Sequence, residues 1–142
     1  MRLPLLLALT LCAAPFAARA ADTASLTVTF TGLEPRGAVN FVLVNSAEAY
    51  GDKAAPVAAD RIAVTGDTAS KTFDGLAPGR YAVKAFHDVN GDGKMGTNPF
   101  GIPTEPYGFS NNAKAAMGPP KWDEAAFQVN AGAGVQTISM AR

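Results

Sequence analysis

Residues 25–44 read SLTVTFTGLEPRGAVNFVLV and decide the fold of this chain. Leu26, Val28 and Phe30 alternate with hydroxyl side chains, so they share one face of an extended segment. A turn containing glycine and proline follows. Residues 38–44 are then almost entirely apolar, which suits a strand in the middle of a sheet. The stretch therefore predicts a half-buried strand, a turn and a central strand.

The rest of the chain continues this pattern of short apolar runs between turn residues. Five further strands are expected at residues 57–64, 69–73, 81–87, 125–129 and 135–140. Residues 46–50 predict one helical turn, with Ser46 as its N-cap and Gly51 as a left-handed stop. Seven short strands without a long helix predict an all-β fold, an antiparallel β-sandwich of two sheets.

Residues 1–20 have the features of a secretory signal peptide. A basic residue precedes a short apolar run, which ends at the small-x-small sequence Ala18-Arg19-Ala20. The run is shorter than the roughly 20 residues that cross a membrane. Leu11 precedes Cys12 where lipidation requires a small residue. We therefore expect a periplasmic or secreted protein with no membrane anchor.

Removal of these 20 of the 142 residues leaves 122, enough for one core, so residues 21–142 are expected to form a single domain. The only cysteine is lost with the leader, and 10 basic and 12 acidic residues remain. This balance, without a basic cluster, argues against nucleic acid or an anionic membrane as partner. We expect a monomer.

Residues 88–122 have no strand pattern, and loops of this length are rare inside compact domains. The segment contains four aromatic residues and five prolines, a composition that favours order. We therefore expect an ordered cap loop over one end of the sandwich, with a short helix at 110–117.

Residues 86–98 read FHDVNGDGKMGTN and resemble the start of a calcium-binding loop. Oxygen atoms at alternate positions can converge on one ion if the two glycines let the backbone curl. The predicted metal ligands are the side chains of Asp88, Asn90, Asp92 and Asn98 and the carbonyl of Lys94.

The loop lacks the glutamate that closes a full calcium loop. Calcium binding would therefore be weak, with a Kd on the order of 10⁻⁴ to 10⁻³ M. The alternative is that Asn90-Gly91 and Asp92-Gly93 form two tight turns without an ion.

The aromatic residues of the cap loop allow two interpretations. Phe100, Tyr107, Phe109 and Trp122 could form a platform for a sugar or a peptide, or a local hydrophobic cluster that seals the sandwich. Trp122, between two charged residues, is the one expected to keep an exposed face.

The residues that could support catalysis are few. His87 is the only histidine, and a packed or hydrogen-bonded role at the end of a strand is the simpler expectation. The sequence around Ser110, GFSNN at residues 108–112, lacks the second glycine of a nucleophile elbow. Without a cluster of titratable groups, a non-enzymatic protein is predicted and an enzyme is the less favoured alternative.

Two resemblances complete the sequence evidence. Residues 73–83, FDGLAPGRYAV, resemble a corner of prealbumin-like and Ig-like sandwich modules, which implies that Leu76 and Tyr81 pack inward. The segments FHDVNGDGK, GIPTEPYGFSNN and GPPKWDEAAF together resemble an exported bacterial family, domain of unknown function 2141. That family commonly has an acidic residue where this chain has Gly96, and the resemblance implies export and fold but no activity.

The sequence therefore predicts an exported, non-enzymatic β-sandwich module stabilised by weak calcium binding at residues 88–98. The alternative is a carbohydrate- or peptide-binding module that uses the aromatic loop at residues 100–122. Its partner, a protein, a peptide or a glycan, is not named by the sequence.

Overall fold

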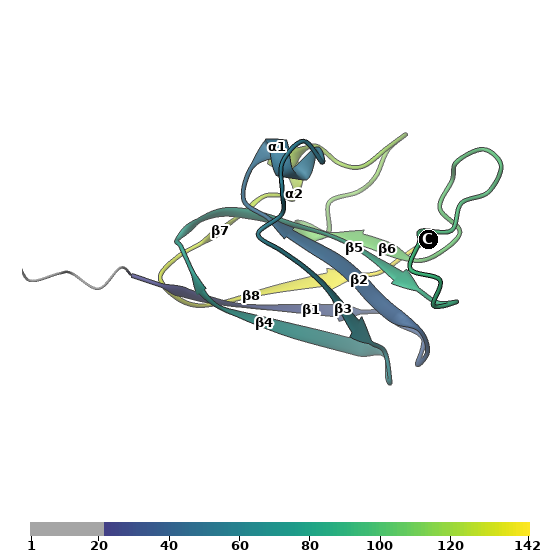
Figure 1. Cartoon of the computed structure of the whole chain (residues 1–142), viewed down its shortest axis with the longest axis horizontal. Coiled ribbons are helices and arrows are strands. Elements are labelled where there is room, and N and C mark those ends of the chain that lie inside the picture. Colours follow the sequence, from purple (N-terminus) through teal and green to yellow (C-terminus); the bar gives the residue numbers. More distant parts are fainter. Residues whose placement is uncertain (1–21) are drawn as a thin grey trace, which may run out of the picture.

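The computed structural model describes residues 22–142, so the predicted signal peptide lies outside the described residues. These residues form two open β-sheets that pack face to face around one main hydrophobic core (Figure 1). The fold is mostly β, as the sequence predicted.

The first sheet has three strands in the order β4-β1-β8. The central strand β1 (Ala24–Thr31) pairs antiparallel with β4 (Thr68–Leu76) and parallel with β8 (Gly132–Ser139). The prediction of a purely antiparallel sandwich is therefore wrong. Strand direction depends on the path of the chain through the other sheet, which a local hydrophobic pattern does not encode.

The second sheet has the order β3-β2-β5-β6 and is antiparallel throughout. Its strands are β2 (Ala38–Val44), β3 (Ala58–Ala63), β5 (Gly79–Asp88), β6 (Tyr107–Phe109) and β7 (Phe127–Val129). β7 pairs with the beginning of β5 and β6 with its end, so both short strands lie along one edge of β5.

The described residues contain eight strands instead of the predicted seven. The additional strand, β6, lies inside the predicted cap loop at residues 88–122 and has only three residues, too few for a visible alternation. The helix expected at residues 110–117 is also shorter than predicted, because only the 3₁₀ turn η1 (Ser110–Asn112) forms.

Two short helices complete the fold. α1 (Ala47–Tyr50) is capped as predicted, since Ser46 Oγ accepts a hydrogen bond from the N–H of Ala49 at 3.1 Å. Gly51 ends α1 at a φ of −84°, so the predicted left-handed stop is wrong. α2 (Trp122–Ala125) begins at the last residue of the predicted cap loop.

The core follows the alternation read from the sequence. Leu26, Val28 and Phe30 of β1 are buried, and the Phe30 ring lies 5.1 Å from that of Phe41 on the facing sheet. Tyr81 is buried as the prealbumin-like corner implies, and its hydroxyl donates to the carbonyl of Ala77 at 2.7 Å. Burial of these side chains is the main stabilising contribution of the fold.

Candidate functional site

The loop after β5 folds around the carboxylate of Asp88, which is fully buried. Asp88 Oδ1 accepts hydrogen bonds from the N–H groups of Gly91 at 2.8 Å and Asp92 at 3.1 Å. Its Oδ2 accepts another from the N–H of Gly93 at 2.9 Å. Gly91 and Gly93 both have positive φ, which allows the backbone to turn its N–H groups inward.

Two side chains on neighbouring strands complete the set of hydrogen-bond donors around the Asp88 carboxylate. Arg61 Nη1 on β3 lies 2.8 Å from Asp88 Oδ2, and Asn40 Nδ2 on β2 donates to the same oxygen at 3.2 Å. Burial alone would raise the pKa of Asp88. The hydrogen bonds from Gly93 and Arg61 outweigh burial, and the pKa of Asp88 lies below its usual value of 3.8.

The other predicted metal ligands organise turns. Asn90 Oδ1 accepts from the N–H of Asp92 at 3.1 Å, and Asp92 Oδ1 from the N–H of Lys94 at 2.9 Å. Asn98 caps a separate turn farther along the chain. These bonds account for the loop conformation without an ion. Within residues 22–142, no group of three or more His, Cys, Asp or Glu side chains is placed to hold a metal. Calcium binding stays a prediction.

Glu105 is a second buried carboxylate. Its Oε1 accepts from the N–H of Val89 and its Oε2 from the N–H of Gly96, both at 2.9 Å. A Cβ at Gly96 would lie 2.7 Å from Thr104 Oγ1, so the chain passes closely there. Glu105 therefore clasps both ends of the loop at residues 89–96.

Residues 96–104 form a small hairpin that stands above the sheet. The N–H of Thr104 donates to the carbonyl of Gly96 at 2.8 Å, and the N–H of Asn98 to that of Ile102 at 2.9 Å. Asn98 Oδ1 also accepts from the N–H groups of Phe100 and Ile102. Phe100, at the tip of this hairpin, is 87% exposed.

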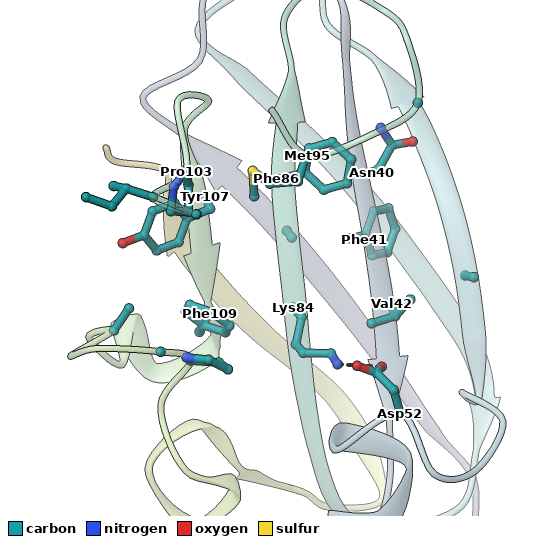
Figure 2. Close-up of a pocket in the computed structure, with 18 of the residues that line it drawn as sticks. Asn40, Phe41, Val42, Asp52, Lys84, Phe86, Met95, Pro103, Tyr107 and Phe109 are labelled. Atoms are coloured by element: carbon teal, nitrogen blue, oxygen red, sulfur yellow. Dashed lines mark hydrogen bonds and ion pairs between the residues drawn. The ribbon is translucent and has the colours of Figure 1, made fainter. Parts of the chain in front are cut away.

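The outer face of the second sheet carries several apolar and aromatic side chains. In the ladder, Asn40, Phe86 and Tyr107 stand side by side across β2, β5 and β6, and Val42, Lys84 and Phe109 form the next row. All six are partly exposed. Figure 2 shows them on the floor of an open groove of about 1550 Å³.

Two loops form the walls of this groove. The first wall is the hairpin at residues 96–104 together with Met95, and the second is the segment at residues 113–120. The second wall is anchored where Tyr50 Oη donates to the carbonyl of Pro120 at 2.9 Å. Burial and the nearby charge of Glu124 raise the pKa of Tyr50 to about 12, so this donor keeps its proton.

The charged side chains that line the groove already have partners. Lys84 Nζ lies 2.7 Å from Asp52 Oδ1, as Figure 2 shows, and also donates to the carbonyl of Tyr50. Asp60 pairs with Lys71 at 2.7 Å. Arg61 pairs with Asp88, as described above. The groove therefore offers a ligand apolar surface and few uncommitted charges.

The four predicted aromatic residues separate into two places. Phe100, Tyr107 and Phe109 line the groove. Trp122 does not line it; its ring packs 5.9 Å from that of Tyr50, and the Arg80 guanidinium lies 5.6 Å from its centroid. Trp122 thus packs in a local aromatic cluster with Tyr50, whereas the other three rings lie at the groove.

The sequence missed several groove residues, among them Phe86, Met95 and Met117. Phe86 could have been found, because it is apolar at a position where the alternation of residues 81–87 leads outward. The two methionines could not, since they reach the groove only through the folding of the walls.

His87 and Ser110 are both fully buried. His87 Nε2 lies 2.8 Å from the carbonyl oxygen of Arg36. Ser110 Oγ accepts from the N–H of Val83 at 2.9 Å and donates to the carbonyl of Ala125. Val83 lies between the residues of β5 that pair with β7 and β6, so Ser110 fills a gap in the ladder.

No helix within residues 22–142 has the length and apolar character needed to cross a membrane.

Comparisons with known proteins identify the family to which this chain belongs. Searches of curated proteins and of solved structures find no match. The model of a family described as uncharacterized proteins conserved in bacteria matches residues 26–138. The match spans both sheets and both walls of the groove, and the chain therefore belongs to this family, DUF2141.

Proposed function

We propose that the protein is an exported, non-enzymatic binding module that holds an elongated apolar ligand in the groove on the second sheet. The observation that carries this proposal is the apolar floor on a sheet face that carries polar residues in an ordinary sandwich. Phe86, Tyr107 and Phe109 remain partly exposed there, and an exposed apolar patch of this kind is typical of an interaction site.

The shape of the site supports the proposal. Most ligand sites are concave, mainly apolar and bounded by loops on a rigid scaffold, as this groove is. Glu105 holds the base of the first wall through the N–H of Gly96, and Asp88 folds the loop that leads into this wall. Tyr50 holds the second wall. A preformed site loses less conformational entropy when a ligand binds.

The groove favours an apolar ligand over a carbohydrate. A sugar presents many hydroxyl groups that need hydrogen-bond partners, and the lining charges are committed within the protein. The rings of Tyr107 and Phe109 meet edge to face at 72°, so they do not form one flat stacking platform. Both observations weigh against the glycan alternative.

The positions of the chemistry-bearing residues support a non-enzymatic role. His87 points into the core, whereas the groove lies on the opposite face of β5. Ser110 is buried and bonded on both sides. Neither residue therefore offers the groove a free acid, base or nucleophile.

The test uses the neutral fluorophore N-phenyl-1-naphthylamine, which brightens in apolar sites. We expect enhanced fluorescence with the mature protein and a loss of most of it in Phe86→Thr, since that change removes an aromatic ring from the floor. The matched control is Val135→Thr, because Val135 is an exposed apolar residue on β8 of the other sheet.

Folding of each variant is checked by circular dichroism. Fluorescence that persists in a folded Phe86→Thr variant would overturn the proposal. Binding of maltohexaose with chemical shift changes at Tyr107 and Phe109 would instead favour the glycan reading.

A further inference from the structure

Four lysines of residues 22–142 form no ion pair. Among the ten basic side chains of residues 22–142, six form ion pairs: Arg36, Arg61, Lys71, Arg80, Lys84 and Arg142. The remaining four are exposed: Lys53, Lys94, Lys114 and Lys121.

Along the chain, each of these four lysines lies within two residues of a residue that lines the groove. Lys53 follows the lining residue Asp52, and Lys94 lies between the lining residues Gly93 and Met95. The other two flank the lining part of the second wall, at residues 115–119. The segments that line the groove thus carry or adjoin four exposed lysines, here called the lysine rim, although acidic residues outnumber basic ones in residues 22–142.

The two walls also end in apolar side chains. Phe100 and Ile102 are exposed on the hairpin, and Met117 is fully exposed on the second wall. Figure 1 shows both loops rising on the same side of the body as α1, the hairpin in green and the second wall in lighter green. Apolar tips beside lysines on one side of a protein are the features by which proteins bind a lipid surface.

A lipid chain fits the groove better than a peptide does. A bound peptide brings backbone N–H and C=O groups that must find partners when buried, and the lining charges already have partners within the protein. An acyl chain has no such requirement. A lipid with an anionic headgroup would also place its charge at the lysine rim.

We propose that this surface docks on an anionic lipid bilayer, with the apolar tips in the headgroup region and an acyl chain against the floor of the groove. This inference rests on the proposed function, since it names the ligand class of the same site. The charge balance of the sequence argued against an anionic membrane as partner, and this inference reverses that expectation. A bilayer docked at the groove responds to the local charge of the lysine rim and not to the net charge of the chain.

The test is sedimentation of the mature protein with phosphatidylcholine vesicles that contain or lack phosphatidylglycerol. We expect binding to the anionic vesicles and much weaker binding to the neutral ones. Each lysine near an anionic surface contributes about fivefold to the partition coefficient. The double variant Lys94→Gln, Lys114→Gln should therefore bind about 25-fold more weakly, and high salt should weaken binding of the unchanged protein.

Apolar insertion is tested with Phe100→Ser and Met117→Ser, whose exposed side chains contribute little to stability. Both variants should lose vesicle binding and keep the melting temperature. The matched controls are Val135→Ser for exposed apolar area and Arg36→Gln for charge, both at residues that do not line the groove. These controls should bind vesicles as the unchanged protein does.

The outcomes separate the two proposals. Fluorophore binding without vesicle binding would overturn the lipid inference and leave the proposed function standing. Equal binding to both vesicle types, or an acidic amphipathic peptide that binds at Phe86 when vesicles do not, would also overturn the inference. If the unchanged protein does not bind the fluorophore, both the proposed function and the lipid inference are overturned.

Discussion

The carboxylate of Asp88 determines the course of the chain after β5. It receives three backbone and two side-chain hydrogen bonds in a fully buried position. In the sequence, the same residue fits the first position of a calcium loop. A calcium loop and a loop held by hydrogen bonds to Asp88 both require oxygen atoms at alternate positions with glycines between them. Only the location of the hydrogen-bond donors distinguishes the two interpretations.

The first prediction concerns the protonation of Asp88. Its pKa in the folded protein is below the usual value of 3.8, so it stabilises the fold above about pH 4 and this contribution is lost as pH falls through the lowered pKa. Asp88→Asn should reduce the free energy of unfolding by roughly 1–3 kcal/mol at pH 7, and the difference should shrink in acid. Urea unfolding of Asp88→Asn and of the unchanged protein, at pH 7 and in acid, measures this difference in the free energy of unfolding.

The control for this prediction is Asp67→Asn, an exposed aspartate at which little change is expected. A difference between Asp88→Asn and the unchanged protein that stays constant from neutral to strongly acidic pH would contradict the role given to Asp88.

The second prediction concerns calcium. A calcium loop predicts that EDTA lowers the melting temperature by a few degrees. The hydrogen bonds of Asp88 favour an unchanged melt, because an ion would have to displace the N–H donors of Gly91 and Gly93. Thermal scans with calcium, with magnesium and with EDTA distinguish the two. A calcium-specific rise would establish the ion at this loop.

At the level of strands and loops, the close approach of the β1–β2 turn to the end of β5 limits what the turn can contain. Gly37 has a φ of +65°, and a Cβ there would lie 2.0 Å from the carbonyl oxygen of Asp88. Gly66, in the β3–β4 turn, has no such neighbour within 4 Å and no positive φ. Two similar glycines in two turns thus carry very different constraints.

The third prediction follows from this contrast. Gly37→Ala should destabilise the fold by more than about 3 kcal/mol, since it combines backbone strain with a steric clash. Gly66→Ala should be nearly neutral or slightly stabilising. Urea unfolding of the two variants makes the comparison, and equal stability of both would show that the turn can relax away from β5.

Across the whole molecule, the two sheets have unlike outer faces. The outer face of the first sheet carries threonine and serine ladders, such as Thr27 with Thr72 and Thr29 with Ser70. The outer face of the second sheet carries Phe86, which lines the groove together with residues of both walls. The molecule therefore has one side suited to water and one suited to an apolar partner, which is the arrangement that both proposals use.

The sequence by itself determined the β class, most strand positions, the cap of α1 and the family. The alternation of residues 25–30 and the corner at residues 73–83 are local patterns, so they could be read without knowing what each strand meets. The prediction for residues 38–44 was confirmed to the residue as β2.

Only the tertiary structure decided the parallel pairing of β1 with β8, the strand β6 and the groove. Each of these depends on residues distant in the sequence, such as Phe86 and Tyr107 across two strands. The use of Asp88 and Glu105 was decided in the same way, because a carboxylate binds whichever donors the folded chain brings to it. The sequence states which groups can bond, and the fold determines which of them meet.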